Sequence, residues 1–258
     1  MGLRITQDDL VLFKYLFEHD FLNRTHIRNY IWQDRHQVST RRRLAKLTRY
    51  GFLKKKLKPN RDRANLTILL PTKKALTALK ENEDKFKNLA RNNTVFYDKI
   101  NPDNYKVRDI KVVEEQFTRF LHKEKIINLR LILEDHGAKN WVSKNIIRRK
   151  AKLKTIPDGL FSRNGDVFAV ELETKKRYDS KYKYKFERYV QEDKVDKIIY
   201  IAGYKSIYDN LIEVINPKFF SKFNANTQYQ NFYIAKYENM INGELQVINP
   251  FKETILEF

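Results

Sequence analysis

The sequence lacks cysteine altogether and holds only seven glycines among its 258 residues. Without cysteine there is no disulfide scaffold, zinc ribbon, iron–sulfur cluster or thiol nucleophile. No apolar run approaches the roughly 18 residues of a membrane span, and the N-terminus lacks the apolar core of a signal peptide. We therefore expect a cytoplasmic protein with no membrane partner.

Motifs of several common enzyme classes are also missing. The few glycines form neither a glycine-rich phosphate loop nor a Gly-x-Ser-x-Gly motif, which argues against a Rossmann enzyme and a serine hydrolase. No two histidines stand two residues apart, so the sequence has no His-hydrophobe-His metal motif; they are His19, His26, His36, His122 and His136.

A large excess of positive charge is the main feature that the sequence does have. Lys and Arg number 52 against 32 Asp and Glu, a net charge of +20, and 41% hydrophobic residues suffice for a folded core. Residues 36–63 contain eleven basic residues and Asp62 as their one acid, so they carry +10, half of the total. Solvated charge runs usually mix both signs, so this segment predicts a surface for the phosphates of nucleic acid.

Residues 1–88 show the patterns of a small helical domain. Apolar residues recur at helical spacing after Thr6, and Asp9 three residues later predicts a capped first helix. Asn23 is a candidate cap for a short second helix, and Gly51 a candidate C-cap for a third. Two alternating segments, 53–57 and 66–70, predict a β-hairpin with a basic tip, and a further helix is expected from Pro71-Thr72.

Three helices followed by a basic hairpin resemble the winged helix-turn-helix family. The segment STRRRLAKLTRYGFLKKK (39–56) resembles its recognition helix and the start of its wing. The resemblance implies that the third helix enters the major groove of DNA while the wing reaches phosphates or the minor groove. The implied DNA-binding residues are Gln37, Ser39, Thr40, Arg42, Arg43 and Lys46 in the helix, and Lys54, Lys56, Lys58, Arg61 and Arg63 in the wing.

The pattern changes after an Asn-rich segment, 89–104, which we interpret as a linker between the first domain and a second one at 105–258. Strand and helix patterns alternate in the second domain, which predicts an α/β fold. We expect helices over 105–121, 178–190 and 206–215, and strands over 127–134, 197–204, 231–237 and 244–248.

Asn164-Gly165 is a strong signal for a type I′ turn between two alternating strands. In the resulting register, paired residue numbers sum to 329, so Asp158 lies opposite Glu171. Directly opposite carboxylates repel each other unless a cation or a shared proton lies between them. Glu173 shares the face of Glu171, and Lys175 follows on that face if the strand continues.

A divalent cation prefers such a set of oxygen ligands. We therefore expect Mg²⁺ or Mn²⁺ at Asp158, Glu171 and Glu173, where the ion polarises a phosphodiester and activates water. Lys175 is expected to orient that water or to stabilise the charge that develops.

The segments Ile156-Pro157-Asp158-Gly159 and Val170-Glu171-Leu172-Glu173-Thr174-Lys175 resemble the PD-(D/E)xK nuclease superfamily. The resemblance implies a mixed sheet flanked by helices and a metal-dependent cut in DNA. Its motif letters match Asp158, Glu173 and Lys175, whereas the hairpin register favours Asp158 and Glu171 as ligands, with Glu173 in place of the lysine. Glu114 or Glu115 is a further, weaker candidate from the preceding helix.

The order of these features is similar to that in plasmid replication-relaxation proteins and in MobC-type relaxases of mobilisable plasmids. Arg108-Asp109 stands where replication-relaxation proteins often have a His before the Asp, which leaves the choice between the two families open. The resemblance implies binding of plasmid origin DNA, nicking of one strand, and mobilisation accessory and coupling proteins as partners. The alternatives are a non-catalytic DNA-binding regulator and an endonuclease of the restriction or transposition type.

Overall fold

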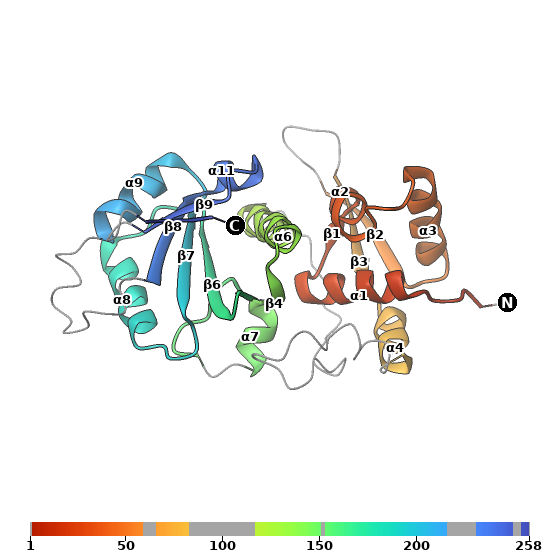
Figure 1. The fold of residues 1–258 in the computed structure, drawn as a ribbon. Coiled ribbons are helices and arrows are strands. Elements are labelled where there is room, and N and C mark those ends of the chain that lie inside the picture. The colour runs from red at the N-terminus through yellow and green to blue at the C-terminus, as the bar shows by residue number, and fades with distance from the viewer. Residues whose placement is uncertain are drawn as a thin grey trace. The chain divides into compact units, whose positions relative to one another are not determined.

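The computed structural model describes residues 2–58, 66–82, 117–150, 153–215, 231–249 and 254–257. The chain divides into two compact units, Met1–Lys123 and Glu124–Phe258 (Figure 1). The expected linker, the wing tip at 59–65, and Glu114 and Glu115 lie outside the described residues. Most of the helix expected over 105–121 lies outside them too.

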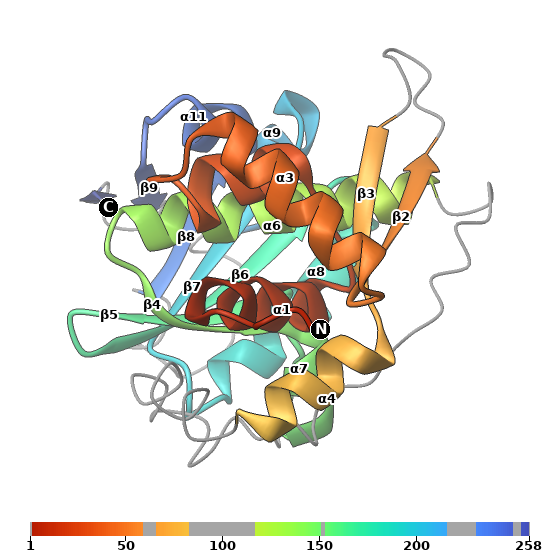
Figure 2. The ribbon, with the colours of Figure 1, turned by 90° about the vertical axis from the view of Figure 1, so that its right-hand side faces the viewer.

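The N-terminal unit has the expected winged-helix arrangement. Its strands form a three-stranded antiparallel sheet in the order β1-β3-β2 (Figure 1), and Figure 2 shows β2 and β3 side by side. In chain order the elements are α1 (Gln7–His19), β1 (Leu22–Asn23), α2 (Arg24–His26), the π-helical turn η1 (Ile27–Ile31), α3 (Gln37–Arg49), β2 (Leu53–Lys58), β3 (Leu66–Pro71) and α4 (Lys73–Glu81).

The predicted helix ends are confirmed. Thr6 and Asp9 form a reciprocal capping box at the start of α1, and the Asn23 side chain caps α2. Thr72 caps α4, with its hydroxyl accepting from the backbone N–H of Ala75. Gly51, at φ +78°, follows α3 in the left-handed conformation that glycine adopts without strain and that reverses the chain into the hairpin.

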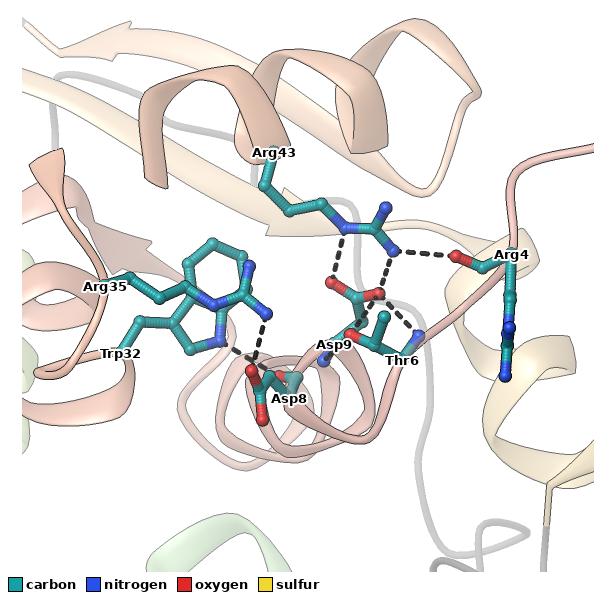
Figure 3. A network of polar contacts seen from close by, with 7 residues as sticks. All are labelled: Arg4, Thr6, Asp8, Asp9, Trp32, Arg35 and Arg43. Atoms are coloured by element: carbon teal, nitrogen blue, oxygen red, sulfur yellow. Dashed lines mark hydrogen bonds and ion pairs between the residues drawn. The ribbon is translucent and has the colours of Figure 1, made fainter. Parts of the chain in front are cut away.

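A buried ion pair joins the first helix to the third. Asp9 is fully buried, and its Oδ1 accepts a hydrogen bond from Arg43 Nε at 3.0 Å (Figure 3). Arg43 Nη2 also binds Asp9 Oδ2 and donates to the Arg4 carbonyl at 2.8 Å. The same carboxylate accepts from the backbone N–H of Thr6 at 2.8 Å, so one buried group caps α1 and anchors α3.

The C-terminal unit is built on a seven-stranded mixed sheet in the order β10-β9-β8-β7-β6-β5-β4. Strands β6, β7 and β8 are parallel, and both sides of this parallel centre are extended by antiparallel strands. The strands are β4 (Lys139–Ser143), β5 (Gly159–Arg163), β6 (Asp166–Glu173), β7 (Lys197–Ala202), β8 (Phe232–Lys236), β9 (Gln246–Asn249) and β10 (Thr254–Glu257).

Helices cover both faces of this sheet. Figures 1 and 2 show α8 (Asp179–Val190) and α9 (Lys205–Val214) on one face and α6 (Phe117–Asp135) on the other. Two shorter helices, α7 (Lys144–Lys150) and α11 (Tyr237–Ile241), contact β4 and β8 respectively. The predicted fold class, a winged helix followed by a mixed sheet flanked by helices, is thus confirmed.

The strand predicted over 127–134 is wrong, because these residues lie within the 19-residue helix α6. All residues from Ile126 to Leu133 are buried except Asn128, which is half-buried, so the helix is covered on all sides there. A continuous apolar run does not distinguish a buried strand from a buried helix. Arg130, inside the run, is buried and pairs with Glu134 one turn later, at 3.0 Å. Strand β4, by contrast, has no counterpart among the predicted elements.

Among the described helices, none combines the length and the apolar character needed to cross a membrane.

Replacing Asp9 by Ala is expected to destabilise the N-terminal unit by about 3 kcal/mol, because Arg43 is left partly buried without its partner. Thr6→Ala, which removes only the cap, is the matched control and is expected to cost about 1 kcal/mol. Urea unfolding followed by circular dichroism gives both values, and hydrogen exchange at the α3 amides identifies the unit that opens. Equal costs for the two variants would show that the ion pair contributes nothing.

Candidate active site and DNA-binding surface

The β5–β6 hairpin has the predicted turn and register. Asn164 and Gly165 adopt φ angles of 52° and 89°, as a type I′ turn requires. Phe161 pairs with Phe168 and Leu160 with Ala169, so the paired numbers sum to 329. The ladder ends at Gly159 and Val170, so it does not contain the predicted pair of Asp158 and Glu171; the Asp158 N–H donates to the Val170 carbonyl at 2.9 Å instead.

Position 159, next to Asp158, has room only for glycine, because a tryptophan ring occupies the space that a side chain would need. A Cβ at Gly159 would lie 2.2 Å from the indole of Trp141, on the neighbouring strand β4. Trp141 in turn stacks on Phe161, at 6.1 Å between ring centroids. This packing holds the strand that carries Asp158 at a defined position.

Three carboxylates are buried where this hairpin ends: Asp158, Glu171 and Glu173 are 5%, 1% and 2% exposed. Asp158 Oδ1 pairs with Lys144 Nζ at 2.7 Å, and its Oδ2 accepts from the backbone N–H of Leu172 at 3.1 Å. Buried charges without partners are very costly, so each carboxylate is expected to have a cation.

The two glutamates share one lysine from helix α8. Lys185 Nζ lies 2.7 Å from Glu171 Oε2 and 3.5 Å from Glu173 Oε1. Glu171 Oε1 accepts from the Tyr189 hydroxyl at 2.5 Å, and Glu173 Oε2 pairs with Arg177 Nε at 2.7 Å. Sequence reasoning placed Asp158, Glu171 and Glu173 in the site but missed these four partners.

Burial governs the protonation of this cluster. It raises the pKa of Glu171 above its usual value, Lys185 opposes that rise, and the negative charge of Asp158 adds to it. Burial lowers the pKa of Lys185, yet the charges of Glu171 and Glu173 outweigh it and raise that pKa above its usual value. The three carboxylates are matched by three cations, Lys144, Lys185 and Arg177, so the shift at Glu171 comes mainly from burial.

Lys185 stands where the sequence analysis expected Lys175. Strand β6 ends at Glu173, and Lys175 is exposed beyond it, so the strand does not continue far enough to bring Lys175 onto this face. Lys185 reaches the acids from α8, whose other inward residues, Tyr182, Phe186 and Tyr189, are buried. Its position three residues after Tyr182 was the only available signal in the sequence, because spacing of three or four places side chains on one helix face.

The described residues contain no group of three or more His, Asp or Glu side chains spaced to hold a metal ion. Lys185 contacts both Glu171 and Glu173, the expected second and third ligands. The charge of Asp158 acts on Glu171 and contributes to the rise of its pKa.

The candidate DNA-binding residues fall into three groups in the structure. Gln37, Ser39, Arg42 and Lys46 are exposed on α3, and Lys54 and Lys56 are exposed on β2. Thr40 is buried, and Arg43 is held by Asp9, so both side chains serve the fold of the unit. The side chain of Lys58 lies outside the described residues, as do Arg61 and Arg63. Three exposed basic residues were not among the candidates: Arg41, Arg49 and Lys55.

Glu171→Gln is expected to change the pH dependence of stability. Because its pKa is raised in the folded state, Glu171 contributes stability that is fully present below its ordinary value of 4.5 and is lost as pH rises through the folded pKa. Wild type should therefore lose stability relative to Glu171→Gln in urea unfolding as the pH rises above 4.5. Glu213→Gln on α9 controls for the removal of a carboxylate. If the difference in unfolding free energy between wild type and Glu171→Gln is the same at every pH, the predicted pH dependence is wrong.

Comparison with curated proteins gives no match. A comparison with protein families matches the one described as replication-relaxation over residues 13–194, from the first helix of the winged-helix unit to the end of α8. That match includes α3, the β5–β6 hairpin, the three buried carboxylates and Lys185. It covers well over half of the sequence, and the chain therefore belongs to the replication-relaxation family.

Proposed function

We propose that this protein is a metal-dependent DNA endonuclease that nicks one strand at a plasmid origin. Family membership supports a role in plasmid replication or relaxation. The observation that carries the proposal is the burial of three carboxylates, Asp158, Glu171 and Glu173, at the end of one hairpin. Burying three carboxylates is costly even when each has a cationic partner, and perturbed buried acids are typical of functional sites.

The donor chemistry of the cluster suits Mg²⁺ or Mn²⁺. Asp158 and Glu171 offer carboxylate oxygens, the ligands that hard divalent cations prefer. Lys144, which neutralises Asp158, is 37% exposed and Arg177, which neutralises Glu173, is 52% exposed, so both can withdraw into solvent. A bound ion would lower the pKa of a water molecule and polarise the scissile phosphodiester.

Lys185 takes the role that the motif letters assign to Lys175. Its ammonium is held beside Glu171 and Glu173, and the raised pKa keeps it protonated. A fixed positive charge at this position is suited to stabilising the negative charge that develops on a phosphate oxygen. Tyr189 orients Glu171 through its hydroxyl and so positions the carboxylate without touching the DNA itself.

The N-terminal unit supplies the DNA-binding surface in this proposal. The exposed basic residues of α3 and β2 carry no nearby compensating acid in the segment 36–58. They match the way in which a winged helix places its third helix in the major groove. A mobilisation role of the MobC type would add accessory and coupling proteins as partners.

A second candidate is a DNA-binding regulator without catalytic activity. It is favoured by the ion pairs themselves, because each carboxylate has a cationic partner and the described residues show no three-carboxylate metal group. A third candidate, an endonuclease that cuts both strands, uses the same residues and differs only in its product.

The nicking proposal is tested with supercoiled plasmid carrying the cognate origin, in Mg²⁺ or Mn²⁺. Wild type should yield open circles, and Asp158→Asn and Glu171→Gln should lower the rate by about hundredfold or more. Lys185→Ala is expected to fall with them, whereas Lys175→Ala, beyond the end of β6, should fall far less. Asp166→Asn, at the opposite end of β6, is the matched control for the loss of one carboxylate.

The products separate the three candidates in the same assay. Open circles that persist in Asp158→Asn would contradict the assigned site. Linear DNA from wild type would identify an enzyme that cuts both strands. Tight binding without any cutting, unchanged in Asp158→Asn, would identify the non-catalytic regulator.

DNA binding by α3 is tested through its salt dependence. The double variant Arg42→Ala, Lys46→Ala should flatten the log–log salt slope of duplex binding by about 2, close to one for each phosphate contact. The double variant Lys73→Ala, Lys80→Ala removes the same charge from α4 and should leave the slope near wild type. If both double variants change the salt slope equally, the net charge of the protein governs DNA binding and α3 is not a defined binding surface.

A further inference from the structure

The structure separates the tyrosines of the C-terminal unit into buried and exposed ones. Tyr182 and Tyr189 on α8 are packed inside, at 0% and 3% exposure. Tyr178 is 79% exposed and Tyr204 58%, which makes them two of the three most exposed large apolar side chains in the described part of the chain. Isolated exposed aromatic residues are common, so their surroundings decide what these two rings can do.

Both tyrosines follow the carboxyl end of a strand, and these two strand ends lie on the same side of the sheet. Tyr178 precedes α8, which follows β6, and Tyr204 precedes α9, which follows β7. Strands β6 and β7 are parallel, with Glu173 paired with Ala202. The N–H of Gly203 donates to the Glu173 carbonyl at 2.8 Å. Tyr204 is the next residue in the chain and therefore follows directly after this backbone contact with the acidic site.

Positive charge surrounds these two tyrosines. Residues 174–185 hold six Lys and Arg against Asp179 as their one acid. Lys175 and Lys176 are exposed in the segment between Glu173 and Tyr178. Lys125 Nζ lies over the Tyr204 ring at 4.7 Å from its centroid, and burial lowers the pKa of that lysine.

Exposed rings among cations are what binding of unpaired nucleic acid requires. Every base has an aromatic face that stacks on a ring, while nearby lysines hold the phosphates. In a duplex the faces of the bases are already stacked on one another, so rings add little there. Tyr184 is set apart from this pair, because it lies further along α8 and its hydroxyl accepts from Arg188 Nη1 at 2.7 Å.

We propose that Tyr178 and Tyr204, with Lys175 and Lys176, form a binding site for a single-stranded segment of DNA beside the acidic cluster. We name these four residues the tyrosine edge. The inference deepens the proposed function, because it makes an unpaired strand the substrate presented to Asp158 and Glu171. Binding at the tyrosine edge itself needs neither metal nor cleavage.

The test measures binding of the full chain to labelled oligothymidylate and to a duplex of equal length, by fluorescence anisotropy in EDTA. The double variant Tyr178→Ala, Tyr204→Ala should bind oligothymidylate on the order of tenfold or more weakly, and duplex within about twofold of wild type. The double variant Tyr178→Phe, Tyr204→Phe keeps both rings and should bind like wild type. Ile241→Ala removes an exposed apolar side chain elsewhere in the unit and controls for loss of surface.

Three outcomes would overturn the inference: unchanged binding in the Ala variant, an equal loss on both forms of DNA, or a loss in the Phe variant as large as in the Ala variant. Circular dichroism of each variant confirms that it is folded. Because EDTA removes divalent ions, the result is independent of nicking. Failure of the nuclease proposal and failure of the tyrosine edge are therefore distinguished.

Discussion

Three carboxylates held out of water at the end of one hairpin need positive charge, and that need organises the surrounding residues. Lys144 reaches Asp158 from the start of α7, Arg177 reaches Glu173 from the segment after β6, and Lys185 reaches both glutamates from α8. Burial raises the pKa of Glu171, and the charge of Lys185 opposes that rise. In the proposed function a divalent cation takes the place of the exposed partners, Lys144 and Arg177, because carboxylate oxygens are its preferred ligands.

The N-terminal unit divides its basic residues between two tasks. In the run Arg41-Arg42-Arg43, the first two side chains are exposed, whereas the third is held by Asp9 and thereby joins α3 to the capped start of α1. A helix that reads DNA must be held firmly while its outer face stays free. The buried pair provides that anchorage, and Arg41 and Arg42 on α3 are exposed, as the proposed DNA-binding surface requires.

Sequence reasoning succeeded where a local signal determines geometry. Asn164-Gly165 predicted the turn and the pairing of β5 with β6 as far as Gly159 and Val170. It failed for 127–134, where an apolar run buried on all sides hides the helical period of α6. The sequence did not predict the ion pairs of Lys185 and Arg43. Their partner acids lie on other helices and strands, and no local sequence pattern encodes the tertiary packing that brings them together.

The most direct measurement of the central claim is a titration with Mn²⁺, followed by the electron paramagnetic resonance signal of the free ion. The account predicts that wild type removes free Mn²⁺ from solution by binding at Asp158 and Glu171, and that Asp158→Asn and Glu171→Gln bind it far more weakly while Asp166→Asn binds like wild type. Binding that is absent from wild type, or that persists unchanged in Asp158→Asn and Glu171→Gln, would contradict the account.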